Sequence, residues 1–166
     1  MRRIINMLAV FLLVPVLLLG GCASARQPML YDNGVGLTIT MQEGMTYFEA
    51  DGFAMALTDE ECMMSAVRDD YAQYSELGYD LEAMSSEEYA ALTAQVNSLE
   101  QDFTPDSNGN LHVSYTNTVD GSDYYYYCVV FKGSDAFWMV TFACLEEYRE
   151  EYSDLFVQWS GSIIVQ

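Results

Sequence analysis

In the first half of the chain, apolar and polar residues alternate in short runs that predict β-strands. Residues 36–41, Gly-Leu-Thr-Ile-Thr-Met, alternate with a period of two and include β-branched side chains. Residues 47–50 and 53–57 flank Asp51-Gly52, a dipeptide typical of a two-residue hairpin turn. We therefore expect one strand followed by a hairpin.

Three longer strand-like runs in the second half predict an antiparallel meander. They cover residues 111–118, 122–131 and 136–144. Asp120-Gly121 and Gly133-Ser134 separate the runs, and each dipeptide predicts a two-residue hairpin loop.

These loops determine which side chains share a face of the sheet. They pair residue 111 with residue 130, and residue 131 with residue 136, so His112 and Cys128 lie on opposite faces. A loop longer by one residue would bring His112 and Cys128 to one face. The His112 face carries His112, Ser114, Thr116, Tyr125, Tyr127, Val129, Phe131, Trp138, Val140 and Phe142. The Cys128 face carries Leu111, Val113, Tyr115, Tyr124, Tyr126, Cys128, Val130, Phe137 and Met139.

The last two of these strands are apolar or aromatic on both faces, so they need cover on both sides. Two helical patterns can supply it. The first covers residues 85–99, where Ser85 and Glu88 form a capping box before an apolar stripe of Tyr89, Leu92, Val96 and Leu99. The second runs from Leu145 and carries an apolar stripe opposite an acidic face, made of Leu145, Tyr148, Tyr152, Leu155, Phe156 and Trp159.

Residues 58–74 fit two patterns. The apolar residues of this segment follow a helical stripe, and Thr58 with Glu61 could form a capping box. Residues 62–67 could equally form a strand after a turn at Asp59-Glu60. The pattern by itself favours the helix.

Residues 1–21 have the layout of a bacterial export signal. Arg2 and Arg3 precede an apolar run, and Leu19-Gly20-Gly21-Cys22 resembles a lipobox, in which the cysteine receives a diacylglycerol and the chain is cut just before it. Acyl chains such as palmitate hold a protein firmly when two are present. We expect Cys22 to anchor the protein to the extracytoplasmic face of the cell membrane. The alternative is an ordinary secretory signal in which Cys22 is incidental.

The sequence after the signal separates into a tether and one domain. Residues 22–34 are small, polar and turn-rich, which is typical of a short lipidated tether. Residues 35–166 contain neither an internal repeat nor a second domain boundary, so we expect a single domain.

The charge of the chain excludes nucleic acid as a partner. The 166 residues include 6 Lys and Arg against 25 Asp and Glu, a net charge of −19, and losing Arg2 and Arg3 with the signal would make it −21. Binding to phosphates needs clustered basic residues, whereas Lys132 is the single lysine. Because 51% of the residues are hydrophobic, the chain should still fold.

Several short sequence segments and the order of the predicted elements resemble those of the PsbP-like family, in particular small lipoproteins of Gram-positive gut bacteria. The resemblance rests on residues 36–41 followed by Glu-Gly-Met at 43–45, on Val-Phe-Lys-Gly-Ser-Asp-Ala-Phe-Trp-Met-Val-Thr-Phe-Ala-Cys at 130–144, and on Trp-Ser-Gly-Ser-Ile at 159–163. It implies an α+β fold, an antiparallel sheet with helices on both faces (an α/β/α sandwich). It also implies a strand at 62–68, which we adopt over the helix.

Candidate catalytic residues are few. His112 is the only histidine, and its place opposite Cys128 argues against the hydrogen-bonded pair that Cys–His catalysis needs. Besides Cys22 there are three cysteines, Cys62, Cys128 and Cys144, and we expect buried thiols. The ladder places Cys128 and Cys144 too far apart for a disulfide, and whether any of the three is bonded stays open.

A metal site is not expected, although calcium stays open as an alternative. Residues 106–110, Asp-Ser-Asn-Gly-Asn, begin like an EF-hand loop. Leu111 stands where the turn glycine belongs, and Asn117 occupies the position of the bidentate glutamate. The other acidic clusters are typical of solvated helix faces and turns. We expect no cofactor.

The resemblance implies a non-catalytic binding or assembly-stabilising module, since that family shares no catalytic motif to carry over. The 13 tyrosines, four of them at 124–127, suit either a core or a binding surface. Uncovered tyrosines beside His112, Ser114 and Thr116 would be the first place to look for a ligand. We predict a lipid-anchored binding or accessory module. An envelope-assembly subunit and a carboxylate-dependent hydrolase are the alternatives.

Overall fold

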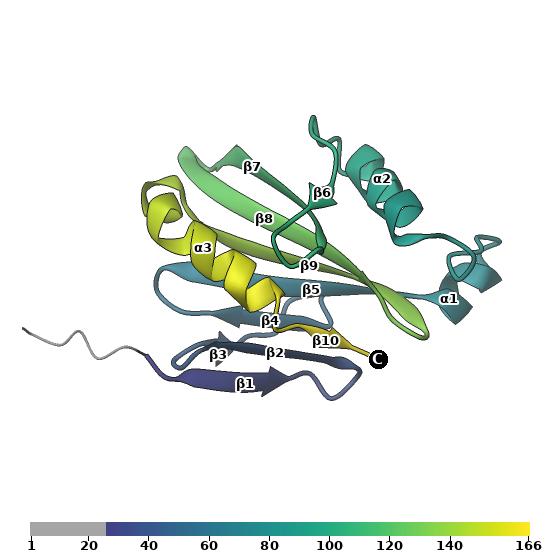
Figure 1. Cartoon of the computed structure of the whole chain (residues 1–166), viewed down its shortest axis with the longest axis horizontal. Helices are drawn as coiled ribbons and strands as arrows, with labels where there is room; N and C mark the ends of the chain where they lie inside the picture. The colour runs from purple at the N-terminus through teal and green to yellow at the C-terminus, as the bar shows by residue number, and fades with distance from the viewer. Residues whose placement is uncertain (1–25) are drawn as a thin grey trace, which may run out of the picture.

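The structure is a computed structural model and describes residues 26–166, which form two antiparallel sheets and three α-helices (Figure 1). The larger sheet has the strand order β3 (Thr46–Tyr47), β4 (Met55–Thr58), β5 (Cys62–Asp70), β9 (Ala136–Leu145), β8 (Ser122–Lys132), β7 (Leu111–Val119) and β6 (Thr104–Pro105). The smaller sheet has the order β1 (Pro28–Asp32), β2 (Leu37–Gln42) and β10 (Ile164–Val165). The helices are α1 (Tyr71–Glu76), α2 (Ser86–Val96) and α3 (Arg149–Ser160), the last preceded by the 3-10 turn η1 (Glu146–Tyr148). The expected α+β class is confirmed. The predicted signal and Cys22 lie outside the described residues.

The meander of β7, β8 and β9 forms the centre of the larger sheet. Leu111 pairs with Val130, as predicted. The second loop is Ser134-Asp135 rather than Gly133-Ser134, because the Gly133 amide donates to the Ala136 carbonyl at 2.8 Å. The β8–β9 register is therefore two residues from the prediction. An even shift leaves every side chain on its predicted face.

Strand β5 completes the centre by pairing with β9 along its whole length, from Cys62–Cys144 to Asp70–Ala136. The strand that the family resemblance implied at 62–68 is confirmed, and the helix favoured by the local pattern is wrong. Asp59 makes the turn into the strand, since its Oδ1 accepts from the amides of Glu61 at 2.9 Å and Cys62 at 2.8 Å. The long-range ladder, which sequence periodicity cannot detect, decides between the two forms.

The His112 face of the larger sheet is covered by α3 and by the small sheet. Phe156 of α3 stacks on Phe142 with ring centroids 5.2 Å apart and also contacts Tyr125. Tyr152 and Trp159 of α3 are buried beside it, which confirms the centre of the predicted stripe. Apolar side chains of β2 join the same core, namely Leu37, Ile39 and Met41.

The Cys128 face is covered along part of its length by α2. Tyr89 of α2 stacks on Phe137 of β9, with ring centroids 4.1 Å apart and ring planes within 3°. Further along this face, Tyr115 and Tyr126 stack on each other at 5.1 Å and stay half-exposed. Cover on this face is thus concentrated at the β8–β9 turn end of the sheet.

Two expectations for the N-terminal part need correction. Residues 28–32, expected in the tether, form β1 and pair with β2 from Pro28–Gln42 to Asp32–Thr38. The hairpin at Asp51-Gly52 has shorter strands than predicted: β3 and β4 pair through Thr46–Thr58 and Tyr47–Leu57, and the Phe48 amide donates to the Ala56 carbonyl at 3.1 Å. Among the described residues, no helix is long and apolar enough to span a bilayer.

The aromatic core under α3 yields a stability prediction. Phe156 is fully buried among four aromatic rings, so Phe156→Ala should lower the free energy of unfolding by about 3–5 kcal/mol. Urea denaturation followed by far-UV circular dichroism measures the change. Leu77→Ala, at an exposed position, should change it by less than about 0.5 kcal/mol. Equal losses for the two variants would contradict the described core.

Candidate functional site

A groove of about 350 Å³ lies between α2, the segment that follows α1, and the Cys128 face of β5 and β9. Its walls are mainly apolar, formed by Val67, Leu81, Leu92, Val96 and Met139. Three tyrosines, Tyr74, Tyr79 and Tyr89, also line it, together with one carboxylate, Asp69. A concave apolar site of this size with few polar groups is typical of small-ligand binding.

Asp69 is the polar centre of the groove. Strand alternation places it on the Cys128 face with Val67, while Arg68 points to the other side. The Tyr89 hydroxyl donates to Asp69 Oδ2 at 2.6 Å, and the Tyr74 hydroxyl donates to Oδ1 at 3.1 Å. Burial, followed by the contact with Asp69, raises the pKa of both phenols, so they stay protonated donors.

Two helix caps bring these tyrosines to Asp69. Asp70 ends β5 and caps α1, since its Oδ1 accepts from the Gln73 amide at 3.0 Å, and Tyr74 follows on the first turn. Ser85 and Glu88 form the predicted capping box of α2, which places Tyr89 over the sheet. The caps are therefore part of the construction of the groove.

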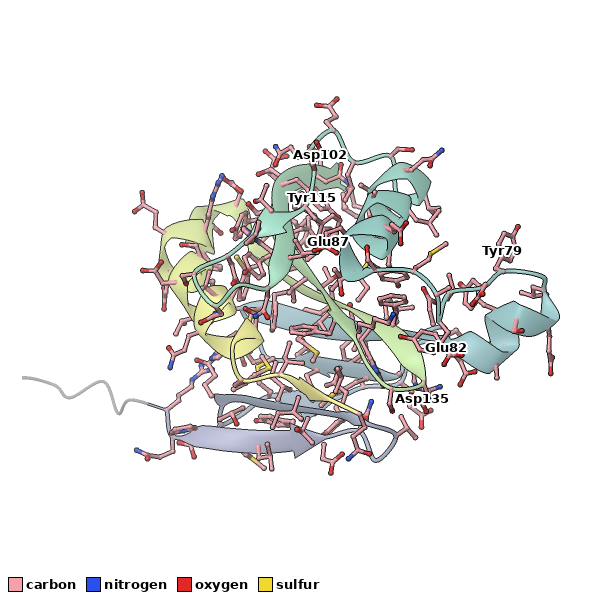
Figure 2. The ribbon with its side chains drawn as sticks, turned by 45° about the vertical axis from the view of Figure 1, so that its right-hand side comes forward. Tyr79, Glu82, Glu87, Asp102, Tyr115 and Asp135 are labelled. Carbon is pink, nitrogen blue, oxygen red and sulfur yellow. The ribbon has the colours of Figure 1, made fainter. Side chains whose placement is uncertain are left out.

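The rim of the groove is exposed and apolar. Leu92 is 37% exposed and Val96 is 73% exposed, because α2 buries only Tyr89 of the predicted stripe residues and otherwise buries Ala90, Thr93 and Ala94. Tyr79, 61% exposed, stands on the segment that joins α1 to α2 (Figure 2). The half of the predicted stripe that α2 does not bury thus forms one side of the groove.

His112 does not belong to this site. Its Nδ1 lies 2.8 Å from the Thr104 carbonyl oxygen, and its ring stacks on Tyr127 at 4.9 Å. Cys128 lies on the other face of the sheet from His112, as predicted, and its cross-strand partner is Val113. Tyr127 beside His112 is buried, so the tyrosines that the sequence analysis named as a first place to look for a ligand belong to the core.

The three described cysteines are free and buried. Burial raises the pKa of the Cys144 thiol to about 11 and also raises that of Cys62 and Cys128, so these thiols are poor nucleophiles. Cys62 and Cys144 are paired neighbours on β5 and β9, a juxtaposition that the sequence analysis missed because it depends on the β5 register.

In the turn at residues 106–110, the Asp106 carboxylate accepts hydrogen bonds from other groups of the protein. Asp106 Oδ1 accepts from the amides of Asn108 and Asn110, and its Oδ2 accepts from the Tyr127 hydroxyl at 2.7 Å. These bonds tie the turn to the sheet. Residues 26–166 contain no group of three or more His, Cys, Asp or Glu side chains arranged to hold a metal ion.

Asp69 itself was not singled out in the sequence, where Asp69-Asp70 is typical of a solvated acidic pair. The signal that could have found it is the alternation of Val67 and Asp69 with Arg68 and Asp70, once residues 62–70 are taken as a strand. The approach of Tyr74 and Tyr89 depends on how two helices return to the sheet, which no local pattern specifies.

Comparison with known proteins supports a PsbP-like fold. The sequence matches no protein-family profile and no curated protein. The solution structure of cyanobacterial PsbP (CyanoP) from Synechocystis sp. PCC 6803 is similar, with a TM-score of 0.50 and 12% identity over 89% of this chain and 96% of that one. A crystal structure from Bacteroides thetaiotaomicron VPI-5482 has a TM-score of 0.51 and 6% identity over 86% of this chain and 49% of that one. At these identities the likeness shows the fold alone.

The hydrogen bonds that Asp106 accepts from Tyr127, Asn108 and Asn110, here called the Asp106 clamp, predict that the stability of the fold depends on pH. Burial alone would raise the pKa of Asp106, but the Tyr127 hydroxyl and the two amides outweigh it, and the pKa is lowered. A lowered pKa contributes stability above about pH 4, the unfolded value, that is lost as the pH falls through the folded value.

Asp106→Asn should therefore be less stable than the wild type at pH 7, and the gap should shrink below about pH 4. Urea denaturation from pH 7 to pH 3 measures it. Asp102→Asn, at an exposed position, should stay near the wild type at pH 7. A gap that widens on acidification would contradict the clamp.

Proposed function

We propose that the protein is a lipid-anchored extracytoplasmic module that binds a ligand in the groove beneath α2 and catalyses no reaction. The observation that carries this proposal is a largely apolar groove whose one carboxylate, Asp69, is occupied by two tyrosine hydroxyls. The two hydroxyl donors hold this carboxylate in one orientation, with one donor on each oxygen. The PsbP-like fold, in which members are mostly non-catalytic, agrees with this role.

The lining of the groove also favours binding over chemistry. Among its described residues there is no histidine, cysteine, lysine or arginine. Nucleophilic catalysis needs an activated nucleophile within hydrogen-bond reach of a base. The groove instead offers shape, apolar area and one fixed charge, which are the properties of a receptor site.

Membrane anchoring is supported by the sequence around Cys22, and the contacts of Arg26 would hold an anchored domain close to the bilayer. Arg26 donates to Asp59 Oδ2 at 2.7 Å, and the strand β1 begins at Pro28. Only residues 23–25 stand between Cys22 and Arg26, a reach of roughly 14 Å even when extended. β1 and α2 lie on opposite sides of the molecule (Figure 1), so an anchored domain would turn its groove away from the bilayer.

A second function, a carboxylate-dependent hydrolase, is favoured by one observation. A more polar hollow of about 550 Å³ beside α3 is lined by both Glu61 and Glu151. Glu61 Oε2 already accepts from the Tyr152 hydroxyl at 2.7 Å. If this hollow were catalytic, the wild type would hydrolyse a panel of ester, peptide or glycan substrates, and Glu151→Gln would abolish the turnover.

The anchor is tested by Cys22→Ala in the intact full-length chain. Removing the thiol should release the protein from the membrane fraction or block its processing, and the mass of the chain should change accordingly. Ser24→Ala is the matched control and should fractionate like the wild type. Unchanged fractionation and mass for Cys22→Ala would refute the lipid anchor.

Binding in the groove is tested by photo-crosslinking in intact cells. A photoreactive amino acid replaces Val96, at the rim of the groove, or Val119, an exposed residue of β7 away from it. We expect a specific adduct, identified by mass spectrometry, at position 96 only. A small-molecule adduct supports the receptor role, and a protein adduct indicates the envelope-assembly alternative. Identical labelling at both positions would contradict a groove-specific ligand.

A further inference from the structure

The groove contains one acidic side chain, Asp69, and no Lys or Arg side chain within residues 26–166 forms an ion pair with it. Arg68, the neighbour of Asp69 in β5, donates to Asp70 at 2.6 Å and to Asp135 at 2.7 Å. Lys132 donates to the carbonyls of Glu82 at 2.8 Å and Met84 at 2.7 Å. The adjacent cations are therefore engaged elsewhere, and the described lining of the groove contains no basic side chain beside Asp69.

From this arrangement we infer that the groove binds a small organic cation, an amine or quaternary ammonium ion that carries an apolar group. The inference rests on the proposed function, because it names the chemical class of the ligand for the same groove. Each oxygen of Asp69 accepts one tyrosine hydroxyl and has a further lone pair free to face a cation.

The tyrosines add a second attraction for a cation. Tyr74 and Tyr79 meet edge to face, with centroids 6.5 Å apart and ring planes 68° apart. Two rings at this angle form adjacent walls of a corner, and the faces of aromatic rings attract ammonium ions. Tyr79 is largely exposed, so a ligand can reach this corner from solvent.

The apolar walls account for the rest of the ligand. Leu92 and Val96 of α2 are exposed at the groove, facing a lining that includes Val67 and Met139 of the sheet. Covering these side chains with an apolar group removes them from water and favours binding. A volume of about 350 Å³ suits a small molecule and is too small for a folded segment of another protein.

Charge distinguishes this ligand class from the other small molecules that the groove could hold. A neutral hydrocarbon would remove water from the Asp69 carboxylate without replacing the lost hydration, which is costly. An anion would face the Asp69 carboxylate, and the described lining of the groove offers no basic side chain to offset the repulsion. Only a cation gains from Asp69 and from the tyrosine faces together.

The test measures the binding of matched probes to the full chain, reconstituted in phosphatidylglycerol nanodiscs so that no lipid carries a quaternary ammonium group. The probes are benzyltrimethylammonium, its uncharged carbon analogue neopentylbenzene, and the anion phenylacetate. Isothermal titration, corrected with empty nanodiscs, gives the affinity. Methyl NMR of Val67, Leu92 and Val96 reports whether a probe enters the groove.

Benzyltrimethylammonium should bind at least about tenfold more tightly than either other probe and should shift the three methyl signals. Asp69→Asn keeps one acceptor oxygen for a tyrosine hydroxyl but removes the charge, so it should weaken binding of the cation by about tenfold and leave binding of the neutral probe unchanged. Asp102→Asn changes the net charge equally outside the groove and should stay within about twofold of the wild type.

Two results would overturn the inference. Equal binding of cation and neutral analogue, with no effect of Asp69→Asn, would show a groove that selects for shape alone and would leave the proposed binding function standing. Absence of methyl shifts with the cation would exclude this ligand class, and the crosslinking at position 96 would then decide separately whether the groove binds anything. Because the readout is binding to a folded protein, methyl spectra of the unliganded variants verify that each retains its fold.

Discussion

The whole structure depends on the requirement that a sheet with two apolar faces be covered on both sides. Strands β8 and β9 carry large side chains in both directions, with Phe142 and Tyr127 on one face and Phe137 and Val130 on the other. Exposing the apolar side chains of either face to water would destabilise the sheet by more than the intrinsic strand propensity of these residues stabilises it. Helix α3 and the small sheet meet this requirement on the His112 face, where the aromatic contacts are dense. The described fold is thus organised from the centre of the larger sheet outwards.

The same requirement is met less completely on the Cys128 face, and the groove is the result. Helix α2 is short and turns Tyr89 and the small residue Ala90 toward the sheet, so its larger side chains, Leu92 and Val96, are left beside the gap. Asp69 occupies the sheet at this point and is satisfied by phenol hydroxyls rather than by a basic side chain. A continuous apolar core would have closed the gap, whereas a charged strand residue keeps it open and polar at its base.

Local rules were sufficient wherever the neighbours in space are also neighbours in sequence. The meander, the capping box at Ser85 and the centre of the α3 stripe were predictable because turn dipeptides, caps and 3.6-residue periodicity act within a few residues. The β8–β9 loop lies one residue later than predicted, which shifts the register by two. A shift by an even number of residues leaves each side chain on its predicted face. Strand β5 was not predictable from its own pattern, because pairing with β9, more than 60 residues away, decides it. The position of Asp69 in the groove was therefore not predictable either, because it depends on residues 62–70 forming a strand.

The order in which the small sheet is assembled has a consequence for biogenesis. The central strand β2 is bordered on one side by β10, and the Gln166 amide donates to the Gly36 carbonyl at 2.9 Å, so a segment near the start of the domain is completed by residues synthesised more than 120 positions later. Contacts of such long sequence separation form late, because the intervening loop must close first. A chain threaded across a membrane with its N-terminus leading would stay incompletely closed until residues 162–166 emerged. This topology therefore delays closure of the small sheet until residues 162–166 are available to pair with the start of the domain.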